Sequence, residues 1–179
     1  MRSRLSLTAL TLMAGLAVAP ASSLAQTADQ GSGEATKVLA SSAGFNAAAV
    51  ESLLKRGDAA VAAGNLAEAR KFYDDARSAS KQLLAFYRDL SGAFRGLDAR
   101  IPREMDTKGR AALALLAQAN LRLAALFRRQ NQPEVAVPVL VEVVRLMTPS
   151  QPEGQKAYQS LLELGFVETP FAGAKPAGS

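Results

Sequence analysis

The chain has 179 residues, of which 21 are lysine or arginine and 16 are aspartate or glutamate, and it has no cysteine, histidine or tryptophan. The lack of histidine and cysteine excludes the usual zinc sites, serine–histidine and cysteine nucleophiles, and histidine proton shuttles. Carboxylate chemistry is left, but no motif supports it, so we predict a non-enzyme without catalytic residues, metal or cofactor.

The N-terminus has the pattern of a secretory signal peptide. Arg2 and Arg4 precede an uncharged apolar run, residues 5–19, and small residues follow up to Ala25. The apolar run is shorter than the roughly 20 residues that a membrane-spanning helix needs. We therefore expect Sec-type export with cleavage after Ala25, which places the protein in the periplasm or thylakoid lumen, or outside the cell. The alternative is an uncleaved membrane anchor.

The rest of the chain is long enough for one domain. Removing residues 1–25 leaves 154 of the 179 residues and lowers the formal net charge from +5 to about +3, because two arginines are lost. Residues 26–44 and 169–179 are small and polar, and such segments bury too little apolar surface to offset the entropy lost on ordering. We expect a flexible linker over 26–44, a helical domain over 45–168 and a disordered tail over 169–179.

Apolar residues recur at helical spacing through most of this domain. The first predicted helix is capped by Asn46 and runs to about Ala63, where Gly64 and Asn65 break the pattern. The second begins near Leu66 and is unusually long.

The second predicted helix carries an apolar stripe with heptad spacing, which Pro102 would end. Its members are Leu83, Tyr87, Leu90, Phe94, Leu97 and Ile101. The favoured interpretation is that the stripe packs on the next helix of the same chain. The alternative is self-association, with residues 83–101 forming a coiled-coil dimer.

Two further helices follow. The third is capped by Asp106 or Thr107 and runs to about Gln130. Its inward face is marked by Leu113, Leu116, Leu123 and Phe127. The fourth starts with Asn131 as its cap and Pro133 early in the helix.

The fourth helix is rich in β-branched residues, but Pro138 argues against a central strand and favours a helix, with a kink there as an open alternative. Residues 150–153 repeat the same start signal, and a fifth helix ends at Gly165. The predicted fold class is all-α, with about five helices arranged as antiparallel hairpins.

Two of these hairpins share a spacing. Small, turn and apolar residues follow one another at intervals of seven, five, four and three in both. In the first hairpin they are Gly57, Gly64, Ala69, Tyr73 and Ala76, and in the second Ala124, Asn131, Ala136, Leu140 and Val143. Closely crossing helices need a small residue where their backbones approach, a turn residue between them and larger apolar groups beyond.

The first hairpin, residues 53–76 (LLKRGDAAVAAGNLAEARKFYDDA), resembles a tetratricopeptide repeat (TPR). The second, residues 121–144, is similar, with Ala124 in place of the glycine and Phe127 at the aromatic position. The hairpins are 67 residues apart, about two TPR lengths, and residues 80–106 form no recognisable middle repeat. A generic five-helix bundle is the alternative.

The TPR resemblance implies a concave surface or hairpin groove that binds a peptide or a protein subunit. Residues 128–140 (RRQNQPEVAVPVL) also resemble stretches of small exported proteins, including cyanobacterial ones, of the accessory or assembly-factor type. We therefore expect a protein-binding scaffold or adaptor.

Candidate partner-binding residues lie in two places. Residues 70–110 contain ten basic and six acidic side chains with aromatic residues among them, and we single out Tyr87, Arg88, Phe94 and Arg95. Phe171, after the last helix, either folds back on the core with Phe166 or anchors a partner. The alternative function is a peripheral contact of this basic segment with anionic membranes. We expect no nucleic-acid partner.

Overall fold

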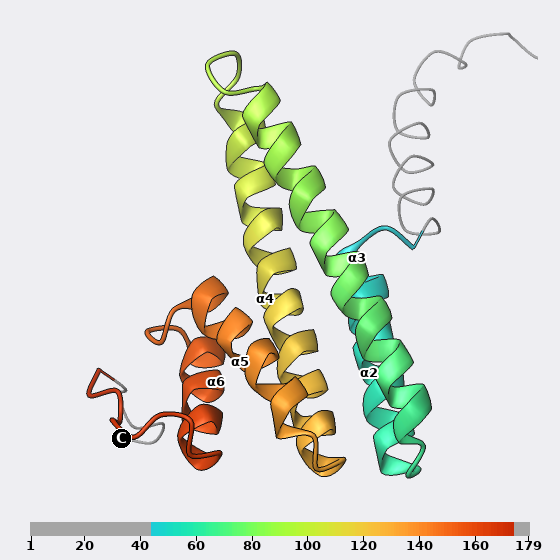
Figure 1. Cartoon of the computed structure of the whole chain (residues 1–179). Helices are drawn as coiled ribbons and strands as arrows, with labels where there is room; N and C mark the ends of the chain where they lie inside the picture. The colour runs from blue at the N-terminus through green and yellow to red at the C-terminus, as the bar shows by residue number, and fades with distance from the viewer. Residues whose placement is uncertain (1–43, 174–179) are drawn as a thin grey trace, which may run out of the picture. The chain divides into compact units, whose positions relative to one another are not determined.

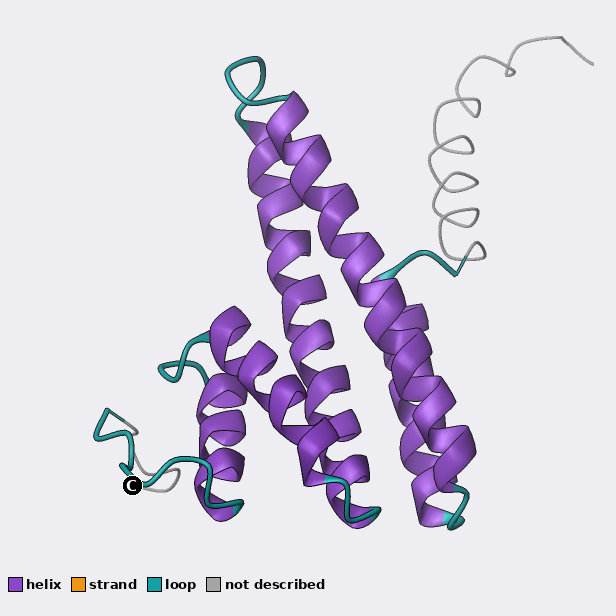
Figure 2. Ribbon diagram, viewed as in Figure 1, coloured by secondary structure: helices purple, strands orange, loops and turns teal. Residues whose placement is uncertain are grey.

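The computed structural model describes residues 44–173, and within this range the chain forms five α-helices and no β-strand (Figures 1 and 2). The helices are α2 (Ala47–Ala62), α3 (Leu66–Ala93), α4 (Arg100–Arg129), α5 (Pro133–Met147) and α6 (Pro152–Glu163). The prediction of an all-α fold with about five helices is confirmed. The predicted signal peptide, nearly all of the linker and the end of the tail lie outside the described residues.

Helix α4 is the centre of the domain. It packs most extensively against α3, then against α5, and it also touches α2 and α6. Its buried face includes Leu116, Leu123 and Phe127, as predicted, whereas Leu113 is half-buried. By length and composition α4 could cross a membrane, but 56% of its most apolar stretch is buried against the other helices. Its apolar character is therefore explained by its place in the core.

Three helices end in the same backbone motif. The N–H of Asn65 donates to the carbonyl of Ala60 at 2.8 Å, that of Gln132 to Phe127 at 2.9 Å, and that of Phe166 to Leu161 at 3.0 Å. In each case the residue before the donor is left-handed: Gly64, Asn131 and Gly165 have φ values of 78°, 55° and 75°. This six-residue closure satisfies carbonyls that a helix end would otherwise leave free.

The capping prediction is right for one helix start and wrong for three others. One of these is the start of α6, where Gln151, and not Ser150, precedes the helix without a side-chain cap bond. The side chain of Asn46 accepts the N–H of Ala49 at 2.9 Å and so caps α2. Asn131 does not cap α5. Instead it is the left-handed residue that closes α4, and Gln132 precedes α5 without a side-chain cap bond. Pro133 does occupy the first helical position, where its missing N–H costs nothing.

The boundary between the second and third predicted helices is also wrong. Helix α3 ends at Ala93, and α4 has already begun at Arg100, so Asp106 and Thr107 lie inside α4 rather than at its start. Pro102 stands in the first turn of α4, where no intrahelical N–H is needed. The carboxylate of Asp98 accepts the first N–H of α4, from Arg100, at 2.8 Å.

Helices α3 and α4 extend beyond the others as an antiparallel pair, here called the arm (residues 87–110). Phe45, just before α2, contacts the ring of Phe86 with centroids 5.7 Å apart, so α3 continues past the point where α2 begins. Figure 1 shows the far ends of α3 and α4, with the loop that joins them, projecting past α2 and α5. The long spacing between the two similar hairpins therefore arises from two elongated helices and not from a middle repeat.

Candidate partner-binding surfaces

The residues predicted to pack the two hairpins lie in the core. In the first hairpin, Gly57 is buried and Ala69, Tyr73 and Ala76 are at most 3% exposed, while Gly64 forms the exposed turn. In the second, Ala124, Phe127, Ala136, Leu140 and Val143 are at most 5% exposed. A Cβ atom on Gly57 would lie 2.3 Å from the Cε1 atom of Tyr73. The glycine therefore sets how closely α2 and α3 approach.

Asp58 joins three helices through hydrogen bonds. Its Oδ1 atom accepts the hydroxyl of Tyr73 from α3 at 2.7 Å and the Nε–H of Arg122 from α4 at 2.9 Å. Arg122 also reaches the second carboxylate oxygen at 3.2 Å. The ring of Tyr73 packs against Gly57. Its hydroxyl therefore lies next to Asp58, the residue that follows Gly57 in α2.

These contacts shift the pKa values of both acidic groups. Partial burial alone would raise the pKa of Asp58, but the hydrogen bonds from Arg122 and Tyr73 outweigh it and hold that pKa below its usual value. Burial, together with the neighbouring carboxylate of Asp58, raises the pKa of Tyr73 well above that of free tyrosine. At neutral pH the cluster therefore consists of a carboxylate, a neutral phenol and a guanidinium.

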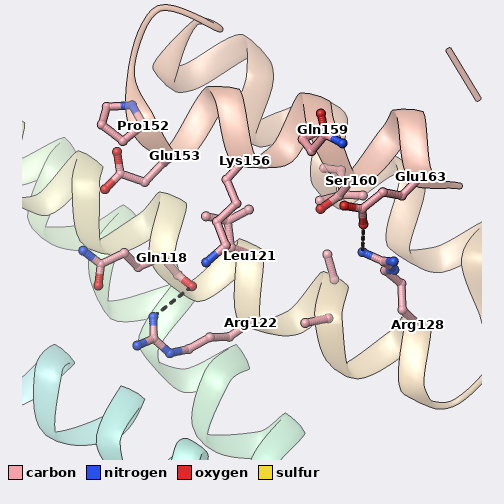
Figure 3. Close-up of a pocket in the computed structure, with 13 residues that line it drawn as sticks. Gln118, Leu121, Arg122, Arg128, Pro152, Glu153, Lys156, Gln159, Ser160 and Glu163 are labelled. Carbon is pink, nitrogen blue, oxygen red and sulfur yellow. Dashed lines mark hydrogen bonds and ion pairs between the residues drawn. The ribbon is translucent and has the colours of Figure 1, made fainter. Parts of the chain in front are cut away.

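A hollow lies between α4 and α6 and is here called the α4–α6 groove. Its volume is about 740 Å³. The lining residues are Gln118, Leu121, Arg122, Ala124, Ala125, Arg128 and Leu140, together with Pro152, Glu153, Lys156, Gln159, Ser160 and Glu163. Figure 3 shows Lys156 extending from α6 toward Leu121 of α4, and the Arg128–Glu163 ion pair, 3.1 Å long, bridging the two helices.

A second hollow, of about 290 Å³, adjoins this groove on the side of α2. It is lined by Asp58, Val61, Tyr73, Arg122, Ala125, Leu126 and Arg129. Arg122 and Ala125 line both hollows. The two hollows therefore lie on either side of Arg122 and Ala125, one toward α6 and the other toward α2.

Four of the five predicted partner-binding residues lie on the arm, but only two of them line the same hollow. Tyr87 and Arg88 line a hollow of about 250 Å³ on the arm, and Phe94 and Arg95 follow at its tip. Tyr87 and Phe94 are half-buried, whereas Arg88 and Arg95 are exposed. Of the stripe residues on α3 and at its C-cap, Leu83 is buried and Tyr87 packs against the core, while Leu90 and Phe94 are half-buried. Self-association through this stripe stays a prediction.

Two members of the predicted stripe lie beyond α3. Leu97 is in the loop and 80% exposed, and Ile101 is in the first turn of α4. The predicted continuous seam over residues 83–101 is therefore wrong at its end, because the loop interrupts the helix.

Phe171 lies apart from the arm, in the segment after α6. The expectation that the two C-terminal phenylalanines close the core is wrong for Phe166, which is 56% exposed, and Phe171 is 39% exposed. Val167 packs against the core instead, and the hydroxyl of Tyr158 donates to the carbonyl of Thr169 at 2.7 Å. This hydrogen bond fixes the start of the predicted tail.

The sequence analysis did not identify the residues that form ion pairs between helices. Arg122 of α4 pairs with Asp58 of α2. Glu142 of α5 pairs with Arg77 and, at 3.2 Å, with Lys81, both from α3. Partial burial tends to raise the pKa of Glu142, but Lys81 and Arg77 lower it below the usual value. The sequence signal that could have indicated such a pair is the single acidic residue, Glu142, within the apolar run of α5.

Within residues 44–173 no group of histidine, cysteine, aspartate or glutamate side chains could hold a metal ion. Comparisons with protein-family models, with curated proteins and with solved structures each found no match to this chain. Proposals about its function therefore rest on the geometry above and on the sequence.

Proposed function

We propose that this protein is an exported, non-catalytic adaptor or assembly factor of TPR type, which binds a segment of another protein in the α4–α6 groove. The observation that carries the proposal is the position of this groove. It lies between α4, the first helix of the second hairpin, and α6, the helix that follows this hairpin, and a second hollow lies toward α2, which begins the first hairpin. Side chains of several elements thus converge on one concave surface.

The spacing of the helix ends supports the TPR part of the proposal. Gly165 closes α6 34 residues after Asn131 closes α4, and 34 residues is the length of one TPR. In this interpretation α2 with the first half of α3, and the second half of α4 with α5, are two repeats. Helix α6 is then the first helix of a third repeat. Tyr158 departs from the pattern, because it stands seven residues before Gly165, where the other two repeats have glycine or alanine.

The groove has the mixture of groups that an extended polypeptide needs. Its volume is within the range of ligand pockets, roughly 300–1,000 Å³. Leu121 and Ala125 offer apolar surface, while the carboxamides of Gln118 and Gln159 can donate to and accept from a peptide backbone. Lys156 is exposed and forms no ion pair with any residue of 44–173, so it is available to a carboxylate of the partner.

The test is a cross-linking pull-down of the exported protein from its native compartment, with partners identified by mass spectrometry. We expect one dominant protein partner, and we expect its recovery to fall at least fivefold in the double variant Lys156→Glu and Gln159→Glu. Both side chains are exposed, so the fold should persist, as circular dichroism would verify. Lys71→Glu, an exposed lysine on α3 outside the groove, is the matched control and should keep the partner.

Equal loss of the partner in the groove variant and in Lys71→Glu would contradict the assignment of the groove. Recovery of only the protein itself and bulk lipid from the wild type would contradict the adaptor function as a whole.

A further inference from the structure

We propose that the tip of the arm docks on a bilayer that contains anionic phospholipids, with Leu97 entering the interface and nearby arginines binding lipid phosphates. This contact is independent of the α4–α6 groove, since the two lie on different parts of α4. It would hold the adaptor at a membrane surface without a spanning helix.

The apolar part of this tip is Leu97. Of the large apolar side chains described as exposed, Leu97 has the highest exposed fraction, 80%, and it is in the loop between α3 and α4. Gly96, with a φ of 86°, supplies the left-handed turn that leads into it. Figure 1 shows this loop at the far end of the arm. A flat surface that approaches from this end would contact the loop before it contacts a helix.

The charged part is a group of arginines around the loop. Arg95 precedes Leu97, and Arg100, Arg103 and Arg110 follow at intervals of three and seven, which place them on one face of α4. Arg95 and Arg103 are exposed and form no ion pair with the described residues. The arm carries six basic and four acidic side chains between residues 88 and 110.

Two of the four acidic side chains between residues 88 and 110 form ion pairs, and neither of these pairs involves Arg95 or Arg103. Asp98 binds Arg100 at 2.7 Å, and Glu104 binds Lys108 at 2.6 Å. Asp106 accepts the hydroxyl of Ser91 at 2.8 Å. The free cations therefore include Arg95 and Arg103, on the two sides of the exposed leucine.

An anionic bilayer fits this surface better than a protein groove does. A convex tip with one protruding apolar side chain and flanking guanidinium groups matches an interface with apolar depth and phosphates at its surface. Each basic residue near such a surface strengthens binding about fivefold, and the effect falls with added salt. Binding should therefore be weak, reversible and salt-sensitive.

The absence of tryptophan from the chain permits a direct test. In Leu97→Trp the new indole is the only tryptophan and reports the environment of the tip. We expect its emission to shift to the blue on addition of vesicles with about one-third phosphatidylglycerol in phosphatidylcholine, and to be quenched by brominated acyl chains. In the control Val141→Trp, a 41% exposed position on α5, the emission should stay unchanged.

The double variant Arg95→Gln and Arg103→Gln, in the Leu97→Trp background, should bind these vesicles about 25-fold more weakly, since each lost cation counts about fivefold. Arg145→Gln, which removes an exposed arginine on α5, should bind as before. The proposal is overturned if the tryptophan at position 97 stays in water while the protein sediments with vesicles, because another segment then holds it. An equal shift with pure phosphatidylcholine, or no binding at all, would overturn it as well.

Discussion

Tyr73 links packing and polar contacts in a single side chain. Its ring fills the space above Gly57, and its hydroxyl donates to Asp58, so the ring has little freedom to move aside. We predict that Gly57→Ala destabilises the domain by roughly 2 kcal/mol, because the added methyl group must displace the ring or separate α2 from α3. The measurement is the free energy of unfolding from urea denaturation followed by circular dichroism.

The matched control for this prediction is Gly92→Ala. Gly92 is also helical, but a Cβ atom there would meet nothing within 4 Å. Replacing it should stabilise the domain by about 0.5–1 kcal/mol, since alanine has the higher helix propensity. If Gly57→Ala stabilised the domain as Gly92→Ala is expected to do, the close contact at Gly57 would not matter in solution.

Asn120 is the most unusual residue of the core. It is fully buried on α4, and neither its amide nitrogen nor its oxygen has a hydrogen-bond partner among the residues described. An unsatisfied buried amide costs about 1–3 kcal/mol. We predict that Asn120→Leu, which has a similar shape, raises the free energy of unfolding by about 1 kcal/mol. A loss of more than 1 kcal/mol would mean that the amide is satisfied in solution.

At the scale of single residues, the sequence predicted which small and apolar residues are buried, but not which charged residues pair with one another. The spacing that selected Gly57, Ala69 and Tyr73 reports steric needs within one hairpin, and all three are buried. The partners of Arg122 and Glu142 lie 64 and 65 residues away, and such pairs leave no local signal in a single sequence.

Among the elements, helix ends were predicted well where glycine or proline fixes the backbone. Gly64 and Gly165 close their helices as expected. The boundary of α3 and α4 was missed because Leu97 and Ile101 continue the heptad spacing across a loop, so the pattern alone could not reveal the break. The second helix was predicted to end at Pro102, but proline also fits the first turn of a helix, where the structure has it.

The link between α2, α3 and α4 should depend on pH through Asp58. Its pKa in the folded protein lies below the unfolded value of about 3.9. The stabilisation is therefore fully present above pH 4 and is lost as the pH falls through the lower, folded pKa. Because Asp58 is partly exposed, we expect the contribution to be about 1 kcal/mol or less.

The experiment compares wild type with Asp58→Asn by urea denaturation between pH 7 and pH 2.5. The difference in unfolding free energy should shrink toward zero at the acid end. Asp75→Asn, an exposed carboxylate on α3 without an ion pair to the described residues, should show little difference at any pH. A difference for Asp58→Asn that persists undiminished at pH 2.5 would mean that the charge of Asp58 is not the cause.

For the whole molecule, the TPR resemblance implied a concave surface or hairpin groove, but the sequence did not predict which helices would line it. The α4–α6 groove combines residues 118–128 with residues 152–163, and its form depends on how α5 places α6 against α4. The sequence analysis placed the partner-binding residues on the arm because charges and aromatic residues are dense there. The structure shows a groove between α4 and α6 and an exposed leucine at the tip of the arm, which we propose bind a polypeptide and a membrane.

The most direct measurement of the central claim is site-specific photocrosslinking in the native compartment. A photoreactive phenylalanine analogue at Gln159 faces the α4–α6 groove, and the same analogue at Lys71 lies on the outer surface of α3. The proposed adaptor function predicts one dominant protein product from position 159 that is missing from position 71. Identical products from both positions, or cross-links at position 159 only to the protein itself, would contradict it.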